Sequence, residues 1–516
     1  MAHYEIMAFP FYFRPGCFEA TQEVLEADIG IYGANAAGVV AALQARRMGL
    51  SSVVCEPLAH VGGLTAGGLS FTDMGSRAAI GGLSRQFYRE CGKYYGAEEE
   101  WKFEPRVASQ VLAAWLAESR AELRLRQFIA GVEKDAGNAV REVRFLGGRR
   151  VRARVWLDCS YEGDLLAMAG ASFHVGREDN AAFEETLNGA QVKPKHQFDF
   201  DIDPFGIEGD AASGLLPQIE NEIPRIGEGD RRVQAYNFRL CLSSEPGNQR
   251  PWEKPEGYDG RQYELLARYF KAGWKEAFHK FDPIRGRKCD MNNHGAVSSD
   301  FVGASWEYPT ASYERREQIF QAHLAYQRGL MWFRAHSEQS PAWVRDRQDG
   351  WKLPLDEFGH SEGWPPQLYV REARRLMSAR TVTEHDCKGA HDVEDAVGMA
   401  SYTMDSHNCT RFAEQVGGKW RVRNEGDVQV GVQPYRISRR SIEPHQSECP
   451  NLLVPVCLSA SHIAYGSARM EPVFMLLAQS AAIVAALAAG AQSAVQQVPY
   501  RDIEAVLRRE GQVLEV

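Results

Sequence analysis

The 516-residue sequence lacks the patterns that mark several large classes of protein. Its ten cysteines are scattered without a C-x-x-C pair, which favours reduced thiols over a disulfide framework or a zinc site. The net charge is −9 and there is no basic block, so nucleic acid and anionic membranes are not expected as partners. Internal repeats and low-complexity segments are also missing from the sequence.

Targeting and membrane-spanning segments are not predicted either. The first residues, MAHYEIMAFPFYFRPG, do not place a basic region before an apolar one, so no signal peptide is expected. The longest apolar run, residues 473–489, contains Gln479 and Ser480 and is short for a membrane span, so it predicts a buried core helix. With the reduced cysteines, these features predict a cytoplasmic protein.

A strand–glycine–helix–strand pattern is present near the N-terminus. An apolar run ends at Tyr32 and Gly33 follows at once, the pattern of a buried strand that enters a turn. The Ala-rich residues 39–48 predict a helix, and residues 52–55 predict a second buried strand that ends in Glu56. This order predicts the βαβ unit of a dinucleotide-binding fold.

Each position in this unit has a chemical reason. Gly33 permits a tight turn, Gly38 permits close packing of helix on strand, and the helix N-terminus offers N–H groups to a pyrophosphate. Glu56 lies 23 positions after Gly33, close to the spacing of a carboxylate that binds ribose hydroxyls. Asn35 replaces the usual middle glycine, so its side chain is expected beside the phosphates. The alternative is an ordinary strand–helix turn.

A glycine-rich stretch follows Glu56. Gly62, Gly63, Gly67 and Gly68 fall within seven residues, which indicates backbone that passes very close to another group. A flexible loop is the alternative, but this stretch follows directly after the predicted ribose-binding position.

Three motifs together resemble the FAD-dependent oxidoreductase family of the glutathione-reductase-like two-dinucleotide-binding flavoproteins. They are G-x-x-A-A-G-V at 33–39, E-P-x-x-x-x-G-G-x-T-x-G-G-L at 56–69 and R-M-E-P at 469–472. The resemblance covers roughly residues 27–490 and implies FAD as cofactor. It implies an α/β fold, with a Rossmann-like FAD-binding domain made of a parallel sheet and a β-meander, and an inserted α+β substrate domain.

The expected domain boundaries follow from this resemblance. The FAD-binding domain is assigned to 27–172 and 387–490, and the substrate domain to 173–386, with an irregular lead-in at 1–26 and a C-terminal tail at 491–516. Residues 123–129, 140–145 and 151–157 are predicted as the meander strands. Within the substrate domain, residues 233–242 are strand-like, and residues 263–270 and 314–328 are helix-like.

The resemblance also assigns the cofactor-binding residues. The last meander strand ends at Asp158, where the family places a second flavin-binding motif. Asp158 and Asp164 are expected to contact ribityl or ribose groups, or else Asp164 caps the next helix. The predicted cofactor-binding residues are Gly33, Asn35, Ala36, Ala37, Gly38, Glu56, Pro57, Gly62, Gly63, Leu64, Thr65, Gly67, Gly68, Asp158, Cys159, Ser160, Gly466, Met470, Glu471 and Pro472.

The C-terminal motif opens a long helix, with Pro472 in its first turn. The small residues 459–468 before it predict a loop. In the family the N-terminus of this helix faces the pyrimidine edge of the flavin, where its dipole stabilises the negative charge of the reduced ring.

The predicted activity is hydride transfer between a small polar substrate, an alcohol, sugar or amine, and flavin N5, by a dehydrogenase or oxidase. A base that titrates near neutrality favours histidine. His462 is the first candidate, followed by His407 and His294, although each could instead be structural. The sequence is compatible with a homo-oligomer, and with covalent FAD at His60 or a cysteine as well as non-covalent FAD.

Two alternative functions remain open. A C=C reductase or desaturase needs an arginine, from residues 371–380 or 436–440, and a binding protein could keep the fold without turnover. A monooxygenase with its own NADPH domain is disfavoured, since a second glycine fingerprint is missing. The arginines of 371–380 are expected on a solvated or salt-bridged helix face, and the alternative is that one of them recognises a substrate carboxylate. His385, Asp386, Cys387 and His391 match no common metal motif, so no metal is predicted.

Overall fold

A computed structural model describes residues 10–516 of the protein, and the start of the predicted lead-in, residues 1–9, lies outside it. From residue 10 to 23 the chain forms no regular element. The side chains of Tyr12 and Phe13 are nevertheless buried and contact the ring of Phe128 edge-on. This segment therefore contributes to the core.

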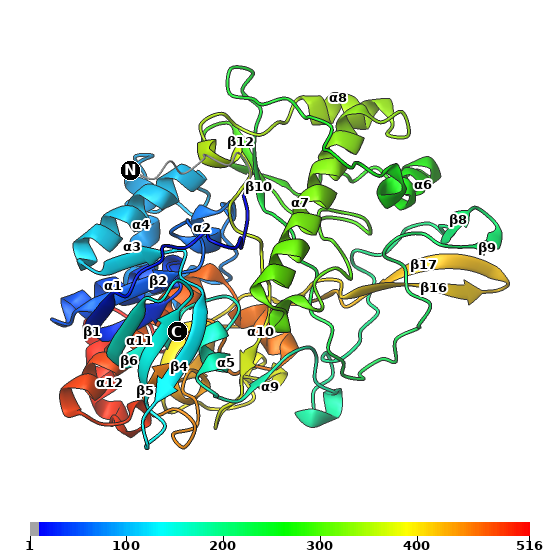
Figure 1. Cartoon of the computed structure of the whole chain (residues 1–516). Helices are drawn as coiled ribbons and strands as arrows, with labels where there is room; N and C mark the ends of the chain where they lie inside the picture. The colour runs from blue at the N-terminus through cyan, green and yellow to red at the C-terminus, as the bar shows by residue number, and fades with distance from the viewer. Residues whose placement is uncertain (1–9) are drawn as a thin grey trace.

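A central, largely parallel sheet organises one side of the molecule (Figure 1). Its strands run in the spatial order β3-β2-β1-β6, with β20 paired to the end of β6 and an antiparallel β5-β4 pair joined to the start of β6. They are β1 (Val24–Tyr32), β2 (Ser52–Glu56), β3 (Glu122–Leu125), β4 (Ile129–Lys134), β5 (Val140–Phe145), β6 (Arg150–Asp158) and β20 (Leu452–Leu453). This arrangement confirms the predicted Rossmann-like α/β fold with a meander.

The first predicted meander strand was wrong, because residues 123–129 belong to two strands. β3 ends at Leu125 and pairs in parallel with β2, whereas β4 begins at Ile129 and pairs antiparallel with β5. Arg126 between them has φ +57°, a left-handed conformation that ends the strand. The meander therefore consists of β4, β5 and β6.

Helices cover the sheet, and α1 packs against the long α11. Inside this contact, the amide of Gln479 donates to Gln44 at 3.0 Å. The helices of this side are α1 (Ala36–Arg47), α2 (Gly63–Ala66), α3 (Gly82–Lys93), α4 (Pro105–Ser119), α5 (Asp164–Met168), α9 (Glu384–Cys387), α10 (His462–Ala468), α11 (Glu471–Ala491) and α12 (Tyr500–Arg509).

The apolar α11 is the one helix among residues 10–516 that has the length and hydropathy of a membrane span. Inside the protein, 89% of its most apolar window is buried, so it lies in the core as predicted. In the C-terminal segment beyond it, α12 packs on α11 and buries Ile503 and Leu507.

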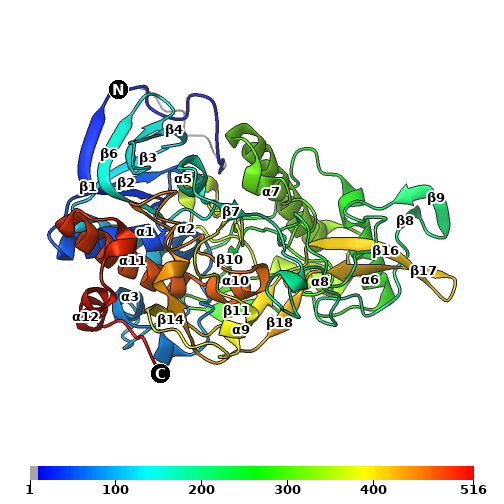
Figure 2. The ribbon, with the colours of Figure 1, turned by 90° about the horizontal axis from the view of Figure 1, so that it is seen from below.

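The remaining elements lie mostly to the other side of the molecule. Both views place α6, α7 and the β8–β9 and β16–β17 hairpins away from the sheet (Figures 1 and 2). These elements are β7 (Phe173–His174), β8 (Phe205–Ile207), β9 (Asp210–Leu215), β10 (Leu240–Ser243), α6 (Glu264–Ala272), β11 (Phe281–Ile284), β12 (Lys288–Met291), α7 (Tyr313–His336), α8 (Ala342–Asp349), β13 (Arg375–Leu376), β14 (Ala396–Ala400), β15 (Met404–Ser406), β16 (Thr410–Val416), β17 (Lys419–Glu425), β18 (Val428–Val430) and β19 (Tyr435–Ser438).

Some predictions for this region held and others did not. The helix-like stretches correspond to α6 and α7, while the strand-like stretch 233–242 forms a regular strand only from Leu240 onward. The domain boundaries stay a prediction. The β16–β17 hairpin, from the segment assigned to the FAD-binding domain, reaches the inserted region, where Phe412 pairs with Glu220.

A buried ammonium joins the two sides of the molecule. The Nζ of Lys288, on β12, lies 2.7–2.9 Å from carboxylate oxygens of Glu104, Asp356 and Glu357. Glu104 precedes α4 on the sheet side, and the side chain of Lys288 is 1% exposed. These three carboxylates lie close enough together to hold a metal ion, but the lysine is their cation here.

We expect Lys288→Met to lower the free energy of unfolding by about 3 kcal/mol, because it leaves buried carboxylates without their shared cation. Lys93→Met, which removes an ammonium with a 68% exposed side chain, is the control and should change stability little. Urea unfolding followed by tryptophan fluorescence measures both variants. Equal stability of the two variants would show that the cluster does not hold the two sides together.

Candidate active site

The turn after β1 is built around two glycines. Gly33 has φ +102°, and a Cβ at this position would lie 2.8 Å from backbone atoms of Cys159 and Ser160 at the end of β6. A Cβ on Gly38 would lie only 1.9 Å from the carbonyl oxygen of Gly33. Both glycines are therefore required by close backbone packing, for the reasons predicted from the sequence.

The side chain of Asn35 makes hydrogen bonds within this turn and does not point into solvent. Its Oδ1 accepts from the N–H of Gly38 at 3.0 Å, and its Nδ2 donates to the carbonyl of Cys159 at 2.5 Å. The side chain is thus the N-cap of α1. The N–H groups of Ala36 and Ala37, in the first turn of α1, remain as donors for an anion.

The glycine-rich stretch forms a packed short helix, α2, and not a flexible loop. A Cβ on Gly63 would lie 2.4 Å from the hydroxyl of Tyr161, and one on Gly68 would lie 2.0 Å from the carbonyl of Arg239. The residues of α2 are all buried. The stretch therefore fits between the end of β6 and the inserted region.

The carboxylate of Glu56 lies directly beside the turn. Its two oxygens accept from the N–H groups of Ala34 at 2.6 Å and Leu58 at 2.8 Å. Burial raises the pKa of Glu56 to about 8, although these two hydrogen bonds oppose the shift.

Asp158 and Asp164 are both held by other groups of the protein. Asp158 closes the turn after β6, where it accepts from Ser160 at 2.6 Å and from the N–H of Leu166 at 2.8 Å. The N-cap of α5 is Gly163, with φ +67°, so the capping alternative for Asp164 was wrong. The carboxylate of Asp164 is buried against two arginines, at 2.7 Å from nitrogens of both Arg316 and Arg374.

The C-terminal motif meets the two N-terminal ones at one carboxyl group. Glu471, the first residue of α11, accepts from Thr65 at 2.5 Å and from the hydroxyl of Tyr161 at 2.8 Å. Burial raises the pKa of Glu471 to about 7, although these two hydrogen bonds oppose the shift. The ends of the chain therefore close on a common site, as the resemblance implies.

A small cavity of about 20 Å³ lies beside Gly33 and Tyr161. Its walls include Gly33, Asn35, Glu56, Ser160, Tyr161 and Gln367. A dinucleotide has donor and acceptor groups that fit this site. The site offers the close backbone turn at Gly33 and Gly38, the free N–H groups of α1 and the carboxylate of Glu56. The residues present are therefore suited to hold FAD, with Gly33–Gly38 and Glu56 toward its nucleotide half and the start of α11 toward its ring.

The predicted loop before α11 was wrong over most of its length, because residues 462–468 form the helix α10. Ser461 is its N-cap. A Cβ on Gly466 would lie 2.8 Å from the carbonyl of Asp405, so this glycine lets α10 lie against β15. The helix places His462 at its buried end.

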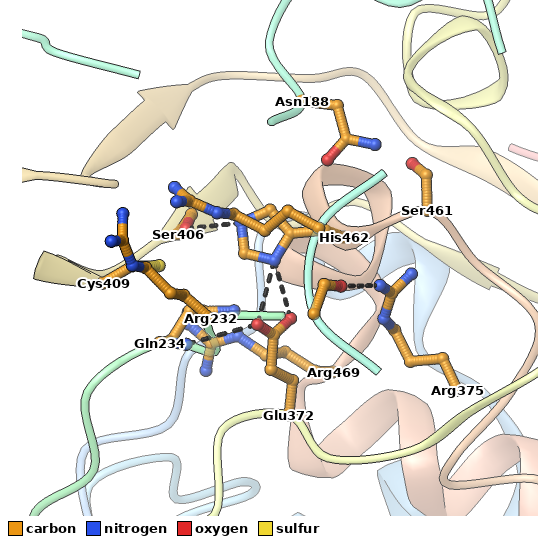
Figure 3. A network of polar contacts seen from close by, with 12 residues as sticks. Asn188, Arg232, Gln234, Glu372, Arg375, Ser406, Cys409, Ser461, His462 and Arg469 are labelled. Atoms are coloured by element: carbon orange, nitrogen blue, oxygen red, sulfur yellow. Dashed lines mark hydrogen bonds and ion pairs between the residues drawn. The ribbon is translucent and has the colours of Figure 1, made fainter. Parts of the chain in front are cut away.

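His462 is held on both sides of its ring (Figure 3). Its Nδ1 lies 2.8 Å from a carboxylate oxygen of Glu372, and its Nε2 lies 3.0 Å from the hydroxyl of Ser406. All three side chains are buried. Both nitrogens of His462 are therefore engaged by the protein itself.

His407 belongs to a neighbouring pair. Its Nδ1 lies 2.7 Å from a carboxylate oxygen of Asp300, while its Nε2 lies 3.5 Å from Asp405. Gln234 joins the two histidines, since its N–H donates to Glu372 at 3.2 Å and its side-chain oxygen accepts from the N–H of His407 at 3.1 Å. The structure thus brings His407 and His462 together.

His294 takes part in a different cluster. Its Nε2 lies 2.9 Å from Glu276, and its ring stacks on His279 with centroids 4.4 Å apart. Burial lowers the pKa of His294. His294 therefore contacts a different group of side chains from the group that His407 and His462 contact.

The arginine-rich residues 371–380 are not a helix, so the predicted helix face was wrong. The segment is extended, with the short strand β13, and three of its arginines make buried ion pairs. Arg371 pairs with Asp300 at 2.8 Å, and Arg375 pairs with Glu178 at 2.6 Å. The predicted salt bridging is real, but it is internal and it links segments far apart in the sequence.

Several residues of the site were missed from the sequence. Glu372, Asp300 and Gln234 orient the two histidines, yet each is an isolated polar residue in the sequence without a motif around it. Only the contacts between distant segments identify them. The roles assigned to the cofactor-binding residues and to the three histidines stay predictions.

We expect Glu471→Gln to change how stability depends on pH. The pKa of Glu471 is about 7 in the folded protein against an ordinary 4.5, so the folded state binds its proton more tightly. The contribution of this tighter proton binding to the free energy of unfolding is therefore complete below about pH 4.5, and it is lost as the pH rises through about 7. Between pH 5 and pH 8, the free energy of unfolding of the wild type should fall by on the order of 2–3 kcal/mol relative to that of Glu471→Gln.

Thermal and urea unfolding at several pH values measure this difference. Glu338→Gln, at an exposed position after α7, controls for the loss of one carboxyl group. Parallel pH profiles for the wild type and Glu471→Gln would contradict the burial of this carboxyl group.

We expect Gly38→Ala to weaken the binding of flavin by about tenfold or more, because the added methyl group forces α1 away from the turn at Gly33. The flavin absorbance per purified chain measures the effect. Gly490→Ala is the matched control, since it adds the same methyl group in open space near the end of α11. Equal flavin content in the two variants would show that this close approach does not shape the binding site.

Comparison with solved structures gives partial matches at low identity. Matches include thioredoxin reductase of T. acidophilum (17% identity, 26% of this chain and 34% of that chain, TM-score 0.18). Others are 3-ketosteroid-Δ4-(5α)-dehydrogenase of Rhodococcus jostii (16%, 28% and 49%, TM-score 0.20) and L-proline dehydrogenase of P. horikoshii (14%, 30% and 59%, TM-score 0.25). The chain spans only a third to three fifths of the length of these proteins.

No curated protein matches the chain. A family model described as FAD dependent oxidoreductase matches residues 28–507, which include all three sequence motifs and nearly every element around the cavity. The chain belongs to the FAD-dependent oxidoreductase family.

Proposed function

We propose that this FAD-dependent oxidoreductase oxidises a small polar substrate, an alcohol or an amine in the first place, with His407 as the base. The proposal rests on the pair formed by His407 and Asp300, which lies beside the segment that leads into α11. FAD, when bound, supplies a two-electron acceptor at N5. The chain itself must bind the substrate and take up one proton.

The charges around His407 suit this role. Burial by itself would raise the pKa of Asp300, but Arg371 and His407 together lower it to about 2. Asp300 is thus a carboxylate at neutral pH and can accept a hydrogen bond from Nδ1 of His407, which orients the ring with Nε2 toward Asp405. The imidazolium that forms is then stabilised by Asp300 on one side and Asp405 on the other.

The reaction balances with these groups. The substrate C–H bond breaks and the hydrogen leaves with the electron pair; bound FAD would accept this hydride and its two electrons. The O–H or N–H proton goes to Nε2 of His407, and the substrate leaves as a carbonyl compound or an imine.

The geometry favours His407 over His462, the first candidate from the sequence. Both ring nitrogens of His462 are occupied, by Glu372 and Ser406, whereas Nε2 of His407 has only the longer contact to Asp405. His462 is better suited to orient Ser406, whose neighbour in the chain is His407. We therefore assign His462 a positioning role.

A second candidate function is the reduction of a C=C bond conjugated to an acid. Three buried arginines around Tyr369 favour it, since such a reaction needs cations that polarise the substrate. The two functions are distinguished by direction: an unsaturated acid reoxidises reduced flavin, whereas an alcohol or amine reduces oxidised flavin.

We expect His407→Gln to slow anaerobic flavin reduction by about 10²–10⁴-fold, because the proton loses its acceptor. Stopped-flow absorbance of the FAD-loaded protein with a panel of alcohols and amines measures the rate. His294→Gln is the matched control and should leave the rate unchanged, since His294 belongs to the separate cluster with Glu276. An unchanged rate in His407→Gln with full FAD would remove His407 from the role of base.

A further inference from the structure

Three arginines surround the ring of Tyr369, and they come from three distant segments. The guanidinium carbons of Arg371, Arg469 and Arg239 lie 4.2, 5.8 and 6.0 Å from the ring centroid. The three side chains are almost completely buried, with 2%, 3% and 2% of their surface exposed. Three buried cations around one tyrosine need a strong compensating reason.

This group, which we call the Tyr369 arginine group, lies directly against the predicted flavin-binding residues. The carbonyl of Arg239 packs on Gly68, where a Cβ would lie only 2.0 Å away. Arg469 is the residue before Met470 and Glu471. Gln367, two residues before Tyr369, packs on Gly67 and lines the cavity beside Gly33 and Tyr161.

Most of the N–H groups in the Tyr369 arginine group have partners within the protein. Arg239 makes two bonds to Asp290, at 2.9 and 2.7 Å. Arg469 donates to the hydroxyl of Tyr369 at 2.9 Å and to the carbonyl of Asp405 at 2.9 Å. These bonds fix the guanidinium groups in place and fill most of their donor capacity.

Two nitrogens are left over. Nη1 of Arg239 and Nε of Arg469 are buried and have no hydrogen-bond partner among the described residues. An unsatisfied buried donor is costly, and more so when it is charged. The carboxyl group of Asp73 lies near and accepts a hydrogen bond from the hydroxyl of Tyr402 at 3.1 Å, but no hydrogen bond joins it to either nitrogen among the described residues. An acceptor from outside the chain would satisfy both nitrogens.

We propose that the Tyr369 arginine group binds a carboxylate of the substrate, which is therefore a small organic acid that carries the oxidisable hydroxyl or amine group. A carboxylate supplies two acceptor oxygens and one negative charge, which match two unpaired guanidinium N–H groups. A neutral sugar offers weaker acceptors for these N–H groups. The inference rests on the proposed hydride transfer and narrows its substrate class.

The test compares an acid with its neutral isostere on the FAD-loaded protein, without turnover. Isothermal titration calorimetry with propionate and propionamide measures binding directly. Propionate is expected to bind at least about tenfold more tightly than propionamide, because its charged oxygens accept stronger hydrogen bonds from the guanidinium groups. Equal affinities for the two compounds, or tight binding of inorganic phosphate in place of propionate, would overturn the proposal.

Variants connect the binding to these residues. Arg239→Gln and Arg469→Gln are expected to weaken propionate binding by about 10–100-fold and to leave propionamide binding unchanged. Arg334→Gln is the matched control, because Arg334 is also buried with an unpartnered Nε but lies on α7 against Phe278. If a glutamine variant loses FAD, Arg239→Lys and Arg469→Lys replace it in the test. They keep the positive charge but lack the planar guanidinium group with its paired N–H donors, and they should still weaken propionate binding. Wild-type affinity for propionate in the FAD-loaded Arg239 and Arg469 variants would overturn the proposal.

Binding and turnover can fail separately. If propionate binds through these arginines but no hydroxy or amino acid reduces the flavin, the carboxylate site stands and the proposed oxidation fails. If a neutral alcohol or a simple amine reduces the flavin with dependence on His407, and acids do not, the proposed function stands and the carboxylate site fails.

Discussion

Close backbone contact at a few glycines is the constraint on which this structure depends. Gly33, Gly38 and Gly63 each lie where a side chain would collide with another segment at 1.9–2.8 Å. Because these contacts join β1, α1, α2 and the end of β6, the first two motifs can meet the start of α11 at Glu471. A single site is thereby made from segments more than 400 residues apart.

Buried charge is the second organising feature, and it acts between segments. Asp164 on α5 holds Arg316 of α7 and Arg374 of the extended segment, and Lys288 of β12 holds Glu104 beside α4. Such pairs are costly to bury, but once formed they are costly to break, so they define how the inserted elements sit on the sheet. His407 likewise lies between the carboxylates of Asp300 and Asp405.

The chemistry proposed here follows from this combination. The glycine contacts shape a site suited to a dinucleotide, and the ion pairs of the inserted region bring histidines and arginines to its edge. Asp300, Glu372 and Gln234 hold the two histidines in fixed orientations, which is the condition for efficient proton transfer. The arginines around Tyr369 differ in that two of their nitrogens have no hydrogen-bond partner among residues 10–516.

Local patterns in the sequence were enough to predict the βαβ unit, the buried α11 and the flavin family, because strand, turn and glycine requirements act over neighbouring residues. The sequence did not reveal that Asn35 caps α1, that residues 462–468 form a helix, or that Arg371 and Arg375 are buried in an extended segment. Nor could it pair His407 with Asp300, 107 positions away, or His462 with Glu372, 90 positions away. Those outcomes depend on which distant carboxylates, amides and backbone groups meet when the chain folds, and only the tertiary structure decides that.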